Sequence, residues 1–167
     1  MTDDLPRAAA AVVTAGRSHG LELDVREFPE GTRTAADAAR AVGCQVDQIV
    51  KSLVFVADTD PVLVLTSGGH RVDVVKVGKE RSAAIVRKAD AEEVRAATGY
   101  AIGGTPPFGH ARELAVLIDR DLTGFDVVWA AAGTPRHVFP IGPGDLVRAT
   151  GGQVADVTLE EDGPPAG

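Results

Sequence analysis

The sequence contains a single cysteine, Cys44, among its 167 residues, and no run of apolar residues approaches the length of a membrane span. One cysteine excludes an internal disulfide framework and fits a protein of the reducing cytosol. A spanning helix needs about 20 predominantly apolar residues in succession. The N-terminal MTDDLPRAAA carries two acids and lacks the apolar stretch of a signal peptide. We therefore expect a cytoplasmic protein with no membrane partner.

Repeats, low-complexity linkers and internal boundaries are also missing from the chain. The length is that of one ordinary domain, and 44% of the residues are hydrophobic, which is enough for a core. The C-terminal EEDGPPAG is acidic and rich in proline and glycine. We expect one domain over residues 1–159, followed by a flexible acidic tail over residues 160–167.

Positive charge is scarce, since the net charge is −7. A protein that grips duplex DNA over a wide face is usually basic, so we do not expect duplex DNA as a partner. The charge is uneven, however, because residues 71–88 hold six basic side chains against two acidic ones, a net +4. This strip either contacts phosphates or is a solvated helix surface with surplus lysine. Its candidate contact residues are Arg71, Lys76, Lys79 and Arg81.

The spacing of apolar residues predicts more strands than helices. Helices are expected over 6–20, 34–42, 71–80 and 90–98, with a helical turn over 144–149. Strands are expected over 23–28, 49–57, 61–67, 83–88, 113–120, 125–133, 137–141 and 154–157. Strands that follow one another in hairpin-like succession indicate an α+β fold with a mixed sheet rather than a βαβ repeat.

Capping signals mark the ends of two of these helices. Thr34 and Asp37 form a capping-box variant, and Gly43 lies where a C′ glycine belongs. The second helix repeats the pattern with Asp90, Glu93 and Gly99. The turn between the two strands at 49–57 and 61–67 reads DTD-P, which predicts a hairpin.

One charged residue interrupts the hydrophobic strand IVKSLVFVA, residues 49–57. Side chains alternate between the faces of a strand, and both faces of this one are apolar, so we expect a central strand buried on both sides. Lys51 and Ser52 are its only polar residues. An unpaired buried ammonium is very costly. Lys51 therefore either reaches solvent at the strand end or projects into a pocket, where it binds an anion or a polar group.

A glycine- and proline-rich segment, GYAIGGTPPFGH at residues 99–110, is the second candidate site. Glycine permits close backbone approach, and proline fixes φ and removes an N–H. The segment is either a tight structural turn or a rigid loop whose N–H groups face a polarised carbonyl or a phosphate. It is no P-loop, because no Gly-Lys-Ser/Thr follows. A similar loop, AAGTPRHVF at 131–139, brings His137 as a structural or pocket residue.

These segments together resemble the YbaK family, the trans-acting relatives of the editing domain in bacterial prolyl-tRNA synthetases. The stretch TAADAARAVGCQVDQIVKSLVF is similar to the family's helix and lysine-bearing strand, which places its essential lysine at Lys51. The family's G-x-x-x-P loop matches Gly103–Pro107, and GFDVVWAAAGTPRHVF resembles a later strand and pocket loop. The resemblance covers residues 20–157. It implies a mostly antiparallel sheet curled around a pocket, with flanking helices.

The resemblance also implies hydrolysis of the ester in mischarged aminoacyl-tRNA. Lys51 would engage the terminal adenosine or its phosphate, and the Gly103-Gly104-Thr105 backbone would hold the ester carbonyl. The remaining pocket residues would be Ser52, Pro106, Pro107, Phe108, Gly109, His110, Gly133, Thr134 and His137, and the basic strip would contact the tRNA. Many family members have serine where this chain has Pro106, so the amino acid removed stays open. Alanine on proline tRNA is the first expectation, and cysteine on proline tRNA the second.

No cofactor or metal is expected, because the four histidines and Cys44 show no ligand spacing. No Ser-His-Asp or Cys-His pairing suits covalent catalysis, which favours assistance by a tRNA hydroxyl or by the amino-acid side chain. An aminoacyl-tRNA synthetase is a further expected partner, in a transient complex. Two alternatives stay open: a non-catalytic module that binds aminoacyl-tRNA or amino acid, and a hydrolase of another small ester or amide.

Overall fold

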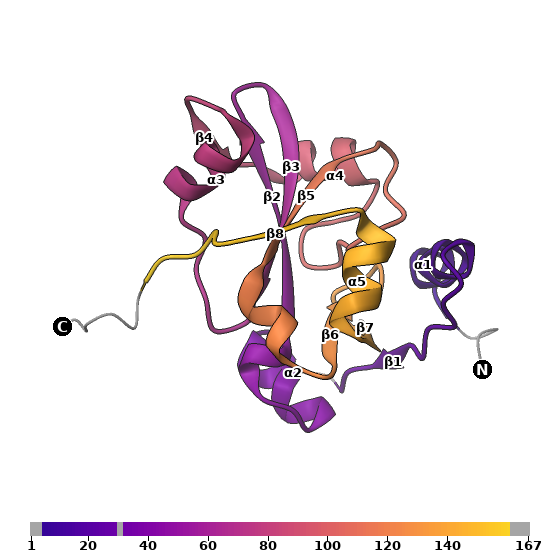
Figure 1. The fold of residues 1–167 in the computed structure, drawn as a ribbon. Helices are drawn as coiled ribbons and strands as arrows, with labels where there is room; N and C mark the ends of the chain where they lie inside the picture. The colour runs from indigo at the N-terminus through magenta and orange to yellow at the C-terminus, as the bar shows by residue number, and fades with distance from the viewer. Residues whose placement is uncertain (1–4, 30–31, 161–167) are drawn as a thin grey trace.

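A computed structural model describes residues 5–29 and 32–160 of the chain (Figure 1). Its helices are α1 (Arg7–Ser18), α2 (Ala35–Val42), α3 (Val74–Arg81), α4 (Ala91–Thr98) and α5 (Pro143–Thr150), with 3₁₀ turns η2 (Val46–Gln48) and η3 (Arg120–Gly124). Its strands are β1 (Arg26–Glu27), β2 (Val50–Ala57), β3 (Asp60–Ser67), β4 (Val86–Lys88), β5 (Ala115–Asp119), β6 (Val128–Ala131), β7 (His137–Ile141) and β8 (Gln153–Ala155). None of the helices in this described part is long and apolar enough to cross a membrane.

The strands form two sheets rather than the single sheet that the sequence predicted. A five-stranded sheet has the order β4-β2-β3-β5-β8, and a three-stranded antiparallel sheet has the order β1-β7-β6. In the larger sheet β5 is parallel to β3 and to β8, while the β2–β3 hairpin and the β2–β4 pair are antiparallel. A parallel bridge between Ile49 and Trp129 connects the two sheets. The α+β class with mixed, mostly antiparallel pairing is confirmed.

Both faces of the larger sheet are covered. Val54 and Leu63 lie opposite each other in the hairpin, and their face packs against α1, α4, α5 and the smaller sheet. The neighbouring pair, Phe55 and Val62, belongs to the other face, which packs against α3 and the segment after β8. A third apolar cluster joins α2 to the smaller sheet around Trp129. Alternate side chains of β2 thus pack into two separate hydrophobic clusters, one on each face of the sheet.

The first half of β2 is not buried on both sides, which corrects the prediction of a fully central strand. Over its whole length β2 pairs with β3, but β4 covers only Phe55–Ala57 of its other edge. Lys51, Ser52 and Leu53 are therefore half-buried at an open edge, whereas the next four residues are buried. The alternation of residues along β2 could not reveal how short the neighbouring strand is.

Local end signals set the helix boundaries as predicted. Thr34 and Asp37 form a reciprocal capping box on α2, and Gly43 ends the helix with φ +79°. Asp90 and Glu93 do the same for α4. The predicted strand at 23–28 shortens to Arg26–Glu27, and the predicted turn at 144–149 is a full helix, α5. Most of the predicted acidic tail, from residue 161 onward, lies outside the described residues.

Candidate functional site

A cavity of about 340 Å³ opens at the uncovered edge of β2. Its walls come from β2, the start of α2, the strand β6, the 102–105 loop and the 134–138 segment, with Lys88–Ala89 and Val94 completing the rim. The volume is at the lower end of the range for pockets that hold small ligands. Such a cavity accepts a small molecule or the end of a larger one.

Lys51 and Ser52 both line this cavity, although they lie on opposite faces of β2. The Lys51 ammonium donates a hydrogen bond to the backbone carbonyl oxygen of His70, in the segment after β3. The Ser52 hydroxyl is buried and has no hydrogen-bond partner within the described part of the chain. A buried hydroxyl without a partner is unfavourable, and a polar ligand group could satisfy it.

The glycine–proline segment supplies another wall through Gly103 and Thr105. Gly103 has φ +90°, a conformation that glycine adopts readily. The N–H of Gly104 donates to the Ala101 carbonyl at 3.0 Å, so this predicted donor is already used within the loop. The Thr105 hydroxyl likewise donates to the Ala101 carbonyl at 3.2 Å. The backbone N–H groups of Gly103 and Thr105 remain the candidates for a ligand oxygen.

His110 forms a hydrogen bond within the glycine–proline segment, on the side away from the main cavity. Its Nε2 lies 2.7 Å from the Pro106 carbonyl oxygen and donates to it. Burial lowers the pKa of His110, against the smaller opposite effect of this hydrogen bond, so the imidazole is neutral near pH 7. In the neutral ring this contact places the proton on Nε2.

Two loops meet at the cavity through the close approach of Gly104 to Gly133 and Thr134. A Cβ built on Gly104 would lie 2.7 Å from the Thr134 Cα and 2.9 Å from the Gly133 carbonyl oxygen. Only glycine permits this contact. Gly104 and Gly133 are therefore buried supports that do not line the cavity, whereas the sequence predicted them as direct contacts.

His137 and Thr134 form a hydrogen-bonded pair in the cavity wall. The Thr134 Oγ1 lies 2.6 Å from Nδ1 of His137 and accepts from the Arg136 N–H at 3.1 Å. If the threonine proton points to Nδ1, the imidazole carries its own proton on Nε2. His137 is only 8% exposed, so this pair is a fixed polar element in a largely apolar wall.

Three basic side chains line the cavity: Arg33, Lys51 and Lys88. No acidic residue is found among the described residues of its lining. In a chain with net charge −7 this local excess favours an anionic ligand group. Arg33 and Lys88 were not predicted as site residues, because nothing in their local sequence pattern shows that the start of α2 and the edge strand β4 meet at this cavity.

Several predicted pocket residues lie elsewhere. Pro106, Pro107 and Phe108 are buried, and Phe108 packs against Phe139 in the core. Residues 107–110 line a separate hollow, between His19 and Thr150. The compact turn that follows Gly103 directs these side chains inward, so we assign them no contact with a ligand in the main cavity.

A sequence model for the aminoacyl-tRNA editing domain matches residues 29–149. The chain belongs to this family. A crystal structure described as that of a candidate trans-editing enzyme for prolyl-tRNA synthetase has a TM-score of 0.89 and 46% identity, covering 93% of this chain and 99% of that one. The editing-domain fold predicted from the sequence is thus confirmed, and the enzyme class is that of an aminoacyl-tRNA deacylase.

Two curated proteins show how the editing domain occurs in different settings. EbsC of Enterococcus faecalis, named as a candidate Cys-tRNA(Pro)/Cys-tRNA(Cys) deacylase, is 26% identical over 80% of this chain and 82% of its own length. The proline–tRNA ligase of Shouchella clausii is 30% identical over 98% of this chain, which spans only 29% of the ligase. The same domain therefore resembles both a free-standing protein and part of a synthetase.

The four predicted tRNA-contact residues of the basic strip lie on α3 and the segment before it, outside the cavity lining, whereas Lys88 at the end of the strip lies on β4 and lines the cavity. Lys76 is held by both carboxylate oxygens of Asp156 at 3.0 Å and by the Thr158 carbonyl at 2.7 Å. The Lys76 ammonium lowers the pKa of Asp156, as expected for an ion pair. Lys76 thus anchors the C-terminal segment, while Arg71, Lys79 and Arg81 are exposed.

Proposed function

We propose that this protein acts in trans to hydrolyse the ester bond of mischarged aminoacyl-tRNA, with a small amino acid, alanine or cysteine, on proline tRNA as the substrate. The observation that carries the proposal is the cavity at the edge of β2, where three basic side chains and a rigid loop meet an apolar wall. The names of EbsC and of the structural neighbour support proline tRNA. Such a substrate places the reaction in the cytoplasm.

The basic residues would hold the 3′ end of the tRNA. The terminal nucleotide brings a phosphate, and Arg33, Lys51 and Lys88 can supply charge-assisted hydrogen bonds to it. Lys51 is half-buried, so its interaction with a phosphate or ribose is less screened than that of an exposed lysine. The buried Ser52 hydroxyl could donate to a polar group of the aminoacyl moiety.

The 102–105 loop would stabilise the charge that develops during hydrolysis. Water attacks the ester carbonyl carbon, and the carbonyl oxygen becomes negative in the tetrahedral intermediate. The bond to the ribose oxygen then breaks, and this oxygen leaves with the proton that the attacking water gives up. Backbone N–H groups of Gly103 and Thr105 are fixed donors for that oxygen. A hydroxyl of the terminal ribose could orient the water, since the enzyme then needs to supply only position and electrostatics.

Selection of the amino acid would depend on the apolar wall and on the Thr134–His137 pair. A small pocket admits alanine or cysteine at little cost and excludes larger side chains by overlap. Discrimination by size alone is worth only about 1–3 kcal/mol per methylene. A synthetase that delivers the mischarged tRNA would add selectivity. We propose such a transient complex because one short basic strip on a chain of net charge −7 favours only weak binding of tRNA by this protein alone.

A deacylation panel tests this proposal. The wild-type protein, Lys51→Ala and the control Arg17→Ala would be incubated with alanine, cysteine, serine and proline on proline tRNA, and with alanine on alanine tRNA. We expect selective cleavage of alanine or cysteine on proline tRNA, lost in Lys51→Ala and kept in Arg17→Ala, whose side chain lies on α1.

Two other outcomes would replace the proposal. Binding of these tRNAs without cleavage would favour a non-catalytic module. Equal cleavage of aminoacyl-tRNA and of a free aminoacyl nucleotide would favour a hydrolase of small esters.

A further inference from the structure

A polar row crosses the larger sheet behind the cavity. Lys51 lies opposite Thr66 in the β2–β3 hairpin, and the parallel register of β3 with β5 continues the row to Asp119. The three residues share one face of the sheet. Thr66 and Asp119 are at most 1% exposed, and the Thr66 hydroxyl has no partner within the described residues. Polar groups gathered in a sheet core need a reason beyond packing.

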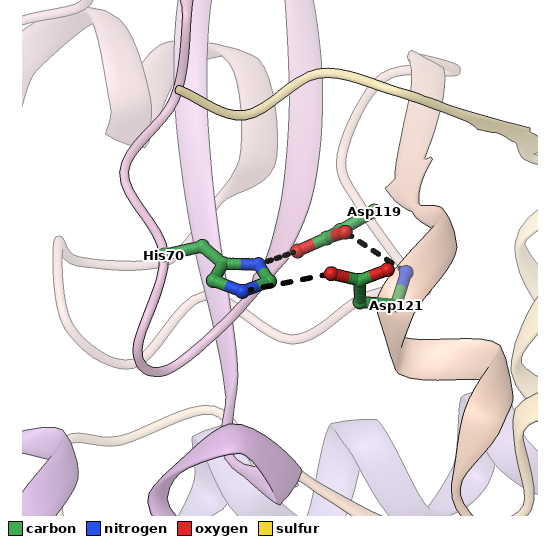
Figure 2. A group of neighbouring side chains, drawn as sticks. All are labelled: His70, Asp119 and Asp121. Carbon is green, nitrogen blue, oxygen red and sulfur yellow. Dashed lines mark hydrogen bonds and ion pairs between the residues drawn. The ribbon is translucent and has the colours of Figure 1, made fainter. Parts of the chain in front are cut away.

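His70 contacts both ends of this row, Asp119 and Lys51. Its Nδ1 lies 2.8 Å from a carboxylate oxygen of Asp119, and its backbone carbonyl oxygen accepts from the Lys51 ammonium. Figure 2 shows the two ring nitrogens facing the carboxylates of Asp119 and Asp121, which lie on the same side of the imidazole. Nε2 is 3.6 Å from an Asp121 carboxylate oxygen. A carboxylate only accepts, so the His70 Nδ1 donates to Asp119 whether the ring is neutral or charged.

Asp119 accepts several hydrogen bonds that hold the turn between β3 and His70. The same carboxylate accepts from the Ser67 N–H and the Asp121 N–H, both at 3.0 Å, so its two oxygens are used by protein donors. Gly68, in this turn, packs closely against η2, and a Cβ on it would lie 2.5 Å from the Val46 carbonyl oxygen. After the turn, Arg71 accepts from the Leu159 N–H at 2.9 Å. The His70 backbone is therefore fixed from several sides.

We propose that His70 and Asp119 are positioning residues for Lys51: their hydrogen bond holds the 67–70 turn so that the His70 carbonyl fixes the Lys51 ammonium at the cavity. This role rests on the proposed deacylase function, in which Lys51 engages the 3′ end of the tRNA. Lysine has a long, flexible side chain, and a fixed acceptor removes much of that freedom before substrate binds. Neither residue touches the substrate.

The charges around His70 agree with this arrangement. Burial lowers the pKa of the His70 imidazole, but the hydrogen bond and charge of Asp119 and the charges of Asp121 and Asp47 outweigh it, so the pKa is raised. The pair keeps its hydrogen bond throughout the titration of His70. Its effect on Lys51 therefore does not depend on whether His70 is charged.

Three variants separate positioning from a purely structural role. His70→Ala removes the donor to Asp119. His70→Asn keeps an amide N–H near the place of Nδ1, and Asp121→Asn is the matched control, because it leaves the His70–Asp119 bond intact. The first readout is the acetylation rate of Lys51, followed by peptide mass spectrometry well below the unfolding temperature. The second is the single-turnover rate of deacylation.

We expect His70→Ala to change the acetylation rate of Lys51 by about three- to tenfold, the shift that loss of one hydrogen bond gives. Its deacylation rate should fall by about tenfold or more. His70→Asn should restore most of both, and Asp121→Asn should match wild type. Should His70→Ala fail to fold, His70→Gln replaces it, because its amide lies one bond further out.

Wild-type acetylation or wild-type deacylation in His70→Ala would overturn the positioning role, as would an unrescued loss in His70→Asn. These results differ from failure of the proposed function. If the wild-type protein cleaves no aminoacyl-tRNA, the deacylase proposal fails, and the acetylation rates still decide whether His70 holds Lys51. If only Lys51→Ala is inactive, the deacylase proposal stands without the His70–Asp119 pair.

Discussion

Replacing Gly104 by alanine should force apart the two loops that meet at the cavity. The added Cβ would face three backbone atoms of Gly133 and Thr134 at 2.7–2.9 Å, distances that real Cβ atoms do not show. Backbone atoms cannot rotate away as side chains do, so one loop must move. Overpacking of this kind costs about 1–3 kcal/mol. About 2 kcal/mol corresponds to a roughly 30-fold rise in the unfolding equilibrium constant.

Urea denaturation measures this loss, with Gly144→Ala as the matched control. Gly144 lies in α5, and a Cβ there would meet no atom within 4 Å, so its replacement should be neutral or stabilise by up to about 1 kcal/mol. Because the moved loop carries Gly103 and Thr105, Gly104→Ala should also slow deacylation. A Gly104→Ala protein within about 0.5 kcal/mol of wild type would refute the close approach, since changes of that size are typical of unremarkable surface sites.

Two further predictions concern charge. Because the pKa of His70 is raised in the folded protein, its titration stabilises the fold below the unfolded pKa of about 6.5, and this contribution is lost as the pH rises through the folded pKa. In urea denaturation, the free energy of unfolding of wild type should exceed that of His70→Asn by more at pH 5 than at pH 9. A difference that is the same at both pH values would contradict this prediction. Charge reversal of Lys79 and Arg81, which are exposed on α3, should weaken deacylation and flatten its dependence on salt, compared with Arg17→Glu. Unchanged kinetics would remove α3 from the tRNA contact surface.

The sequence predicted most of the local structure, because local structure depends on neighbouring residues. Thr34 with Asp37 and Asp90 with Glu93 gave the helix starts, and the DTD-P turn gave the hairpin. The open edge beside Lys51 was not predictable, because it depends on the length of β4, a strand more than 30 residues away. Alternating apolar residues report which face a side chain belongs to, but they do not report whether a neighbouring strand is present.

The site was predictable only in part for a similar reason. Lys51, Ser52, Gly103, Thr105, Thr134 and His137 line one cavity, as the combination of motifs suggested. Phe108 does not, because the turn after Gly103 directs it into the core, and apolar residues near glycine give no sign of that direction. The contribution of Asp119 was also hidden. A carboxylate at a strand end is usually solvated, and only the tertiary structure buries it beneath His70.

The central claim is that the cavity at the edge of β2 holds the aminoacylated 3′ end of tRNA. A crystal structure with 3′-(L-alanylamino)-3′-deoxyadenosine, in which an amide replaces the labile ester, tests it most directly. We predict the alanyl group in the cavity, its carbonyl oxygen at the N–H groups of Gly103 and Thr105, and a contact from Lys51 to the nucleoside. Binding at another surface, or binding of equal affinity to Lys51→Ala, would contradict the account.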